Sequence, residues 1–221
     1  MKNQKWMTFD CYGTLVDWNG GFRGILERIA GDRADELVTA HHHFEAEVEL
    51  ETPHLSYREV LARTLKQAAA SCTLELPPGS EYAISDSWSE ITPFPDVEIE
   101  LARMREAGFK LGILTNCDDN LFEQTHAQFA RRFDLVITAE QAMDYKPSLS
   151  HFRRFQRVSG VEDAYWIHTA YSWFHDMVPA SKLGINSIWV DRDQTGHDPS
   201  YAKVRIPSAS GLCDVAQRLT C

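Results

Sequence analysis

The sequence predicts an α/β fold, in which a Rossmann-like, doubly wound parallel sheet carries a small all-helical domain inserted after its first strand. A short apolar strand at residues 5–10 is followed by a long block, residues 17–89, in which apolar side chains recur with helical spacing. After residue 95, short apolar segments alternate with segments of helical period, a pattern typical of βαβ crossovers. The expected units are a catalytic core at residues 1–15 and 92–221 and a helical cap at residues 16–91.

Each element is predicted from the spacing of its apolar residues and from the polar or turn-forming residues at its ends. Polar residues stand mainly at the ends of the first strand, as expected of a strand that is buried in a sheet. Within the helical block, Phe22, Ile25, Leu26 and Ile29 repeat at three- and four-residue spacings. The expected elements beyond it are helix 97–107, strand 109–114, helix 120–130, strand 133–138, helix 150–158, strand 164–168, helix 174–183 and strand 187–190.

The bulk composition excludes several classes of protein. The formal net charge is −10 and no basic stripe occurs, which argues against binding to nucleic acid. Five cysteines without a CxxC pair indicate reduced thiols in a cytoplasmic protein. The first strand begins too early for a signal peptide, and no apolar run approaches the ~18 residues of a membrane span, so we expect a soluble protein without a membrane partner.

The most informative segment is the end of the first strand, where an apolar run finishes on Asp10 and a Gly13-Thr14 turn follows. The carboxyl end of a parallel strand opens on the crevice where ligands bind, so Asp10 is a candidate nucleophile. For this residue alone, a buried carboxylate that only caps the turn is an equal alternative. The residue two places on is Tyr12, where metal-assisted phosphoryl transfer would favour a second acid.

Polar residues follow three further predicted strands. Thr115 and Asn116 can hold an anion or orient a carboxylate, although a simple helix cap explains them equally well. Lys146 stands before a proline, and a cation close to Asp10 would keep that carboxylate ionised. Asp176 lies in the first turn of a predicted helix, where the dipole favours a negative charge. Capping alone is again the alternative.

Together these segments resemble the four motifs of the haloacid dehalogenase superfamily, and the match covers nearly the whole chain. Residues 9–15, Phe-Asp-Cys-Tyr-Gly-Thr-Leu, are most similar to the L-2-haloacid dehalogenase branch, as are residues 91–97. The resemblance implies a Rossmann-like core with a helical cap and a hydrolase that displaces halide from a small 2-haloalkanoic acid. It also implies an aspartyl-ester intermediate, no metal, no cofactor and, in many members, a homodimer.

The resemblance assigns a role to each motif residue. Asp10 would be the nucleophile, Lys146 the cation that positions it, and Asp176 the group that steers Lys146 and the hydrolytic water. Thr14, Thr115 and Asn116 would help to hold the carboxylates. The expected substrate-binding residues are Cys11, Tyr12, Thr115 and Trp173, the last of these forming an apolar pocket with Phe174.

The sequence departs from the family pattern in the first cap helices. The well-known members grip the substrate carboxylate with an arginine, and residues 39–45 contain none. The consecutive histidines 41–43 and Arg23 are the candidates for binding the anion, with a solvated helix face or a surface charge as the alternative for each. Tyr171 stands where metal-using relatives place an acid.

Three classes of function stay open from the sequence. The first is the hydrolase with an Asp10 ester, acting on a 2-haloacid or on another electrophilic carbon. The second is a magnesium-dependent small-molecule phosphatase, against which Tyr12 and Tyr171 both argue. The third is a non-enzymatic binding protein, which the joint presence of Asp10, Lys146 and Asp176 disfavours.

Overall fold

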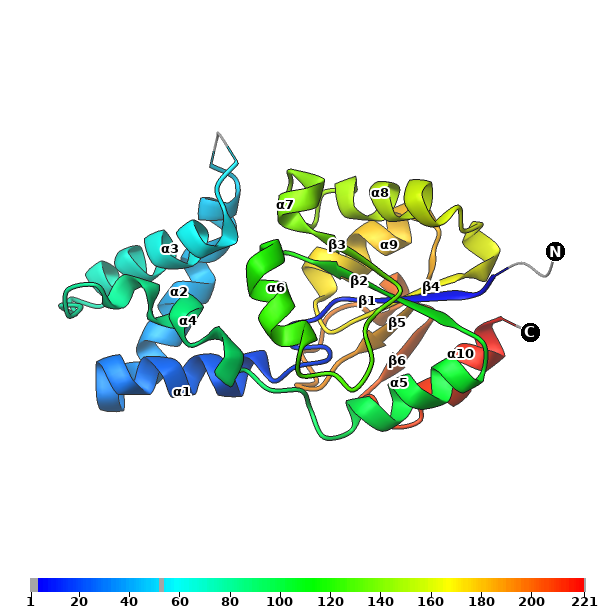
Figure 1. Ribbon diagram of the computed structural model, residues 1–221. Helices are drawn as coiled ribbons and strands as arrows, with labels where there is room; N and C mark the ends of the chain where they lie inside the picture. The colour runs from blue at the N-terminus through cyan, green and yellow to red at the C-terminus, as the bar shows by residue number, and fades with distance from the viewer. Residues whose placement is uncertain (1–3, 52–53, 221) are drawn as a thin grey trace.

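The computed structural model describes residues 4–51 and 54–220 and contains a six-stranded, all-parallel sheet (Figure 1). The strand order β3-β2-β1-β4-β5-β6 is that of a doubly wound sheet, which confirms the predicted α/β fold. The first strand lies in the middle, so its carboxyl end meets those of β2 and β4. The strands are β1 (Trp6–Phe9), β2 (Lys110–Thr115), β3 (Leu135–Thr138), β4 (Trp166–Ala170), β5 (Asn186–Val190) and β6 (Val204–Ile206).

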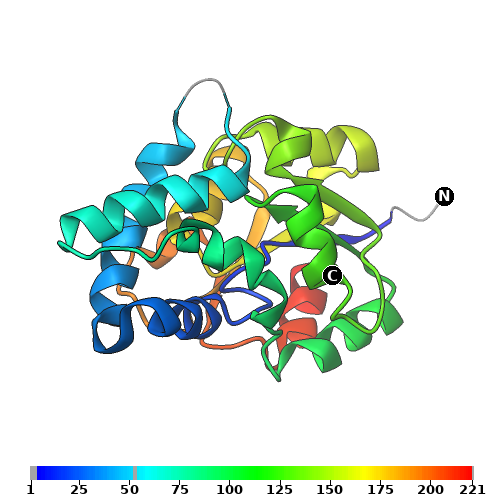
Figure 2. The ribbon, with the colours of Figure 1, turned by 60° about the vertical axis from the view of Figure 1, so that its left-hand side comes forward.

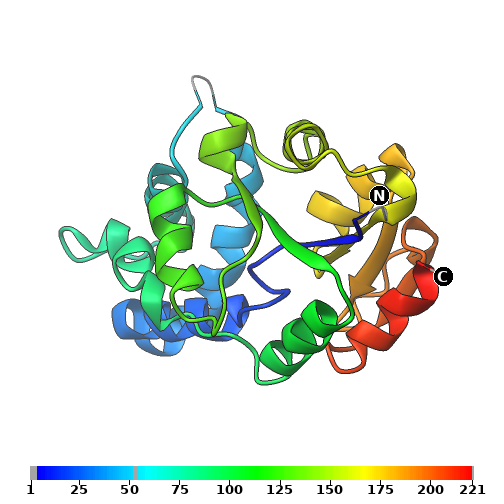
Figure 3. The same cartoon turned by 45° about the vertical axis from the view of Figure 1, so that its right-hand side comes forward.

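Both faces of the sheet are covered by helices (Figures 1 and 3). One face packs against α5 (Val97–Glu106) and α10 (Leu212–Leu219), which lie side by side, and the other against α8 (Ser150–Ser159) and α9 (Val178–Leu183). Consecutive residues of β1 enter different apolar clusters, Trp6 that of α8 and Met7 that of α5. A central strand of a parallel sheet is buried on both sides, which explains why β1 is apolar on both faces except for Thr8.

The chain between β1 and α5 forms four α-helices and three short 3₁₀ turns, and no strand occurs in its described residues. This helical segment, residues 18–90, stands at the carboxyl ends of the strands (Figures 1 and 2). It begins where Asp17 accepts a hydrogen bond from the backbone of Gly20 at 3.0 Å. Its helices are α1 (Trp18–Ala30), α2 (Ala34–Glu49), α3 (Tyr57–Ser71) and α4 (Ala83–Asp86), with 3₁₀ turns at Gly31–Arg33, Ser80–Tyr82 and Trp88–Glu90.

The two chain segments that join the helical segment to the sheet run beside each other. Asp17 donates its backbone N–H to the Thr92 carbonyl at 2.9 Å, and Phe94 donates to the Leu15 carbonyl at 3.0 Å. These bonds tie the outgoing and returning chains together within a few residues.

The structure differs from the expected elements at several places, and the predicted helix 120–130 already ends at His126. The sheet has an edge strand, β6, and a final helix, α10, that were not predicted, because β6 is only three residues long and stands behind a polar, turn-rich stretch. Strand β4 continues to Ala170, two residues further than expected. The predicted helix 174–183 is a π-helical turn, Trp173–Met177, followed by α9. The remaining helices are α6 (Asp119–His126), the short α7 (Ala139–Ala142) and 3₁₀ turns at Asp163–Tyr165 and Pro199–Tyr201.

Four of the cysteines are buried free thiols, and Cys221 lies outside the described residues. None of the helices within residues 4–51 and 54–220 is long and apolar enough to span a membrane.

Replacing Gly112 by alanine is expected to destabilise the protein by about 1–3 kcal/mol, because the sheet has no room for a side chain there. An added Cβ would lie 2.6 Å from Phe155 Cε2 and 3.2 Å from the Leu135 carbonyl oxygen. Urea unfolding measures the change. Gly24→Ala is the matched control: no neighbouring atom lies within 4 Å of its added Cβ, so it should raise the stability of α1 by roughly 0.5–1 kcal/mol. Equal effects at both positions would contradict the packing argument.

Candidate active site

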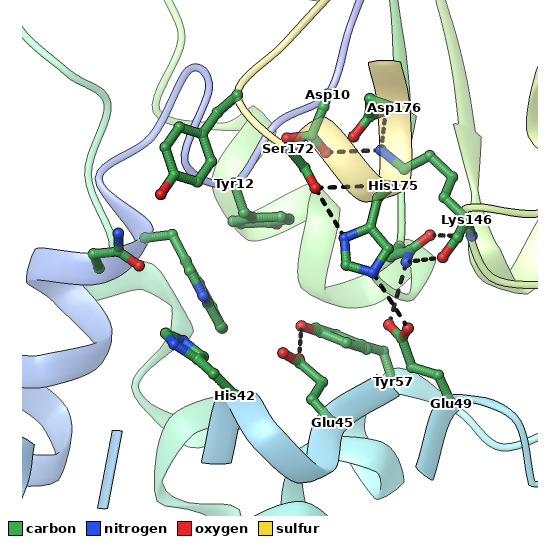
Figure 4. Close-up of a pocket in the computed structure, with 14 residues that line it drawn as sticks. Asp10, Tyr12, His42, Glu45, Glu49, Tyr57, Lys146, Ser172, His175 and Asp176 are labelled. Carbon is green, nitrogen blue, oxygen red and sulfur yellow. Dashed lines mark hydrogen bonds and ion pairs between the residues drawn. The ribbon is translucent and has the colours of Figure 1, made fainter. Parts of the chain in front are cut away.

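A cavity of about 310 Å³ lies between the carboxyl ends of the strands and the helical segment (Figure 4). The sheet side contributes the ends of β1, β2 and β4, and the other side contributes α1, α2 and α3. The lining residues are Asp10, Tyr12, Trp18, Asn19, His42, Glu45, Glu49, Tyr57, Asn116, Lys146, Tyr171, Ser172, His175 and Asp176.

Asp10 and Lys146 meet at this cavity, although 136 residues separate them in the chain. Lys146 Nζ donates to Asp10 Oδ1 at 2.9 Å, to Asp176 Oδ1 at 2.7 Å and to the Leu114 carbonyl oxygen at 2.9 Å. An ammonium has three N–H donors, and all three are used, so the side chain is fixed in direction as well as in position. The hydroxyl of Thr14 donates to the other carboxylate oxygen of Asp10 at 2.8 Å.

Asp176 projects from the π-helical turn that follows β4, and its Oδ1 also lies 2.9 Å from His168 Nε2. Behind His168, its Nδ1 lies 2.9 Å from the hydroxyl of Thr8, which accepts from the indole N–H of Trp166 at 2.8 Å. With the ring proton on Nε2, His168 donates to Asp176 and accepts from Thr8, so each of these polar atoms is paired. The second oxygen, Asp176 Oδ2, is buried without a hydrogen-bond partner in the described structure.

The charges of this cluster depend on one another. Burial acts to lower the pKa of Lys146, but the adjacent carboxylates of Asp10 and Asp176 raise it above its ordinary value. Burial alone would raise the pKa of Asp176, yet Lys146 and His168 hold it at about 2. Burial also raises the pKa of Asp10, while Lys146 opposes this shift. A carboxylate of raised pKa is more basic, and therefore a stronger nucleophile, than an exposed one.

The sequence-predicted residues divide into those that reach the cavity and those that do not. Asn116 lines it, but its amide binds the backbone of Lys146, accepting from its N–H at 2.7 Å and donating to its carbonyl at 3.1 Å. Asn116 therefore holds the loop of the lysine. Cys11, Thr115 and Trp173 lie outside the lining: Cys11 is buried beneath it, and the hydroxyl of Thr115 faces Cys117 Sγ at 3.5 Å. The Thr115 hydroxyl therefore faces a thiol and not a carboxylate, while substrate contact by these three residues stays a prediction.

Trp173 belongs to a separate aromatic cluster instead. Its ring stacks on His197 at a centroid distance of 5.0 Å and meets Tyr201 at 4.8 Å, while Phe174 is half exposed. The predicted pocket of Trp173 and Phe174 is therefore absent, because the π-helical turn directs Asp176 toward Lys146 and leaves these two aromatics on its outer side. The aromatic lining comes from Tyr12, Trp18 and Tyr57, in addition to Tyr171.

Tyr12 and Tyr171 stand at the two positions where metal-using relatives are expected to have acids. The phenol of Tyr12 lies 3.0 Å from Thr125 Oγ1 and accepts from Trp88 Nε1 at 2.9 Å. The phenol of Tyr171 donates to Asp193 at 2.6 Å. Both hydroxyls therefore have partners other than the Asp10 carboxylate.

Of the residues that the sequence offered for binding an anion, Arg23 and the histidines 41–43, only one lines the cavity. Arg23 is half exposed and pairs with Asp35 at 2.6 Å and Glu27 at 3.1 Å, outside the cavity lining. His41 is buried against Phe22, and of the three histidines only His42 lines the cavity. Of the two alternatives for Arg23, its pairing with two exposed carboxylates favours the surface charge.

Several lining residues were missed by sequence reasoning. Glu45 and Glu49 enter the cavity one helical turn apart on α2, and Tyr57 enters from α3. The i, i+4 spacing of two acids was visible in the sequence, but such pairs usually mark a solvated helix face.

The two carboxylates at the floor of the cavity already share a cation. Asp10 and Asp176 both bind Lys146. In residues 4–51 and 54–220, no group of three or more His, Cys, Asp or Glu side chains is placed to hold a metal ion.

This fold and site define a class of hydrolase. A protein-family model described as haloacid dehalogenase-like hydrolase matches residues 4–163, and the chain belongs to this family.

Individual relatives are similar over nearly the full length. The chain is 24% identical over 211 residues to an (S)-2-haloacid dehalogenase of Pseudomonas fluorescens, covering 92% of this chain and 91% of the relative. It is 22% identical over 215 residues to haloacetate dehalogenase H-2 of Moraxella sp. (strain B), covering 91% and 94%. Among solved structures, the L-2-haloacid dehalogenase of Xanthobacter autotrophicus with chloropropionic acid covalently bound superimposes with a TM-score of 0.82 at 19% identity, covering 97% and 98%.

Replacing Thr8 by valine is expected to destabilise the protein by about 1–3 kcal/mol, because it leaves the Trp166 indole N–H and His168 Nδ1 buried and unpaired. Thr169→Val is the matched control on the neighbouring strand, since the Thr169 hydroxyl is buried without a partner in the described structure. Urea unfolding of both variants measures the difference. Equal losses of stability would show that the chain of hydrogen bonds behind Asp176 contributes nothing.

His41 is expected to weaken the fold in mild acid. Burial, followed by the proximity of His42, lowers its pKa from 6.5 to about 3. A histidine of lowered native pKa contributes stability that is full above its unfolded pKa and is lost as the pH falls from 6.5 toward the native value. At pH 5 this loss amounts to about 2 kcal/mol. In His41→Leu, the free energy of unfolding should therefore fall less between pH 7 and pH 5 than in the wild type; an unchanged pH dependence would contradict this assignment.

Proposed function

We propose that this protein hydrolyses a carbon–halogen bond of a small 2-haloalkanoic acid by way of an ester on Asp10. The observation that carries the proposal is the Asp10 carboxylate at the floor of a small cavity, held by Lys146 at 2.9 Å and by Thr14 at 2.8 Å. The (S)-2-haloacid dehalogenases to which the chain is similar support the substrate class. A cavity of about 310 Å³ suits a small molecule.

The first step is an in-line displacement at the substrate carbon. One carboxylate oxygen of Asp10 forms a bond to this carbon while the carbon–halogen bond breaks, and the halide leaves with the electron pair. Lys146 and Thr14 fix the carboxylate before the attack, so little reorganisation is needed in the transition state. The product of the step is an ester between Asp10 and the substrate.

The second step returns Asp10 to its carboxylate form. Water adds to Cγ of the ester, and the bond between Cγ and the substrate oxygen breaks. The 2-hydroxy acid leaves with one water proton, and the second proton is released. Lys146 Nζ, next to Asp10 Oδ1, stabilises the negative charge that forms on the ester oxygen. Asp176 Oδ2, buried at the cavity and free of other partners, is the acceptor that orients the water.

The helical segment acts as the cap in this proposal. Residues of α1, α2 and α3 form the wall opposite Asp10, so the segment closes the cavity over the substrate and limits access of bulk water to the ester. The proposed division of the chain remains a core at residues 1–15 and 92–221 and a cap at 16–91.

Asp10→Asn is expected to reduce halide release from 2-chloropropionate by at least about 10³-fold, because an amide is not a competent nucleophile. Release by the wild type should be unaffected by EDTA. Asp32→Asn, at an exposed acid of the Gly31–Arg33 turn, is the control and should retain full activity. Hydrolysis of phosphate esters that needs magnesium, with no halide release from any haloacid, would overturn the proposal.

A single turnover in ¹⁸O-labelled water identifies the intermediate. If the ester forms on Asp10, the label enters the Asp10 carboxylate, while the hydroxyl oxygen of the product comes from the enzyme. Mass spectrometry of the peptide that contains Asp10 measures this exchange. Label in the product after the first turnover, with none in Asp10, would instead indicate direct attack by water.

A further inference from the structure

Two glutamates of α2 form the wall of the cavity opposite Asp10. Glu45 and Glu49 are separated by one helical turn, so their side chains leave the same face of the helix (Figure 4). Both line the cavity, and the side chain of Glu49 is only 6% exposed. The two carboxyl groups therefore line the same cavity as the Asp10 carboxylate.

Each glutamate is held by one uncharged donor. The phenol of Tyr57 donates to Glu45 Oε1 at 2.6 Å, and the amide of Asn116 donates to Glu49 Oε1 at 3.2 Å. These bonds fix one oxygen of each group and leave the other for a ligand. Beside the pair, His175 Nε2 lies 3.9 Å from Glu49 Oε2 and is buried without a hydrogen-bond partner among the described residues, which also indicates a site for a ligand.

The titratable groups around the pair supply almost no positive charge. His42 lies on α2 itself, at the solvent-exposed side of the cavity. His175 Nε2, from the π-helical turn, is 3.9 Å from Glu49 Oε2, but burial lowers the pKa of His175 to about 4. Lys146 is the one ammonium of the lining, and both Asp10 and Asp176 already bind it.

Glu45 and Glu49 lie one helical turn apart, and the cavity lining offers neither of them an unpaired cation. Burial raises the pKa of both Glu45 and Glu49, and the charge of Glu45 raises the pKa of Glu49 further. A carboxylic acid group is a hydrogen-bond donor, whereas a carboxylate is only an acceptor. Glu45 and Glu49 can therefore bind an anionic group when a proton is shared between one of the glutamates and that group.

We propose that Glu45 and Glu49 form the subsite for the substrate's carboxyl group, and that they bind this group by sharing a proton with it. The inference rests on the proposed function, which supplies a carboxylate substrate. One proton taken up with the substrate cancels its negative charge, so no arginine is required on α2. A 2-haloamide, which is neutral, binds without this proton.

The experiment compares 2-chloropropionate with 2-chloropropionamide between about pH 5 and pH 9, with halide release as the readout. For the acid, KM should rise toward tenfold per pH unit in the alkaline part of the range, with kcat little changed, while KM for the amide stays flat. In the double variant E45Q/E49Q, whose amides donate at every pH, the rise should disappear. E47Q, an exposed acid of the same helix, is the matched control and should keep the wild-type profile.

Calorimetry with Asp10→Asn and 2-chloropropionate, in buffers of different ionisation enthalpy, counts the protons directly. About one proton taken up per acid bound above the midpoint of the KM rise, and about none in the added presence of E45Q/E49Q, supports the subsite. A KM for the acid that is flat in the wild type, or a rise that survives in E45Q/E49Q, overturns it. Turnover of the amide alone also overturns it, in favour of a subsite for donor groups. No halide from either compound at any pH is the separate failure of the proposed function.

Discussion

The site depends on a single buried ammonium, Lys146, shared between two carboxylates. Its three donors are satisfied by Asp10, Asp176 and the Leu114 carbonyl, which belong to three different strands or their following turns. A buried charge of this kind is tolerated only when it is paired, and removing one partner usually costs about 3–5 kcal/mol. The chain therefore has to bring β1, β2 and the turn after β4 into register before the charges can be buried. The same requirement fixes the position of the nucleophile.

Much of this arrangement could be predicted from the sequence, because parallel strands place their carboxyl ends along one edge. The positions of Asp10, Lys146 and Asp176 follow from that rule once the strands are recognised, and the central place of β1 follows from its continuous apolar pattern. Strand β6 could not be predicted because three partly exposed residues carry too little pattern. The position of Trp173 could not be predicted because it depends on His197 and Tyr201, which contact its ring and are distant in the chain.

The residues of the opposite wall of the cavity could not be predicted from the sequence, for a different reason. The acids of α2 have the same spacing as those on any solvated helix, and only the contact of the helical segment with the sheet edge turns them inward. Glu45 and Glu49 depend on neighbours, Tyr57 and Asn116, that are distant in the chain. The motifs that resemble the family include Asp10, Lys146 and Asp176 at the floor of the cavity, whereas Glu45 and Glu49 belong to none of these motifs.

The paired connections between the sheet and the helical segment have a mechanical consequence. Because Asp17 is bonded to Thr92 and Phe94 to Leu15, both ends of the helical segment are held at one place beside the sheet. The position of α2 relative to Asp10 is therefore set by backbone hydrogen bonds at the base of the segment as well as by side-chain packing, and a change at either connection would displace both glutamates together.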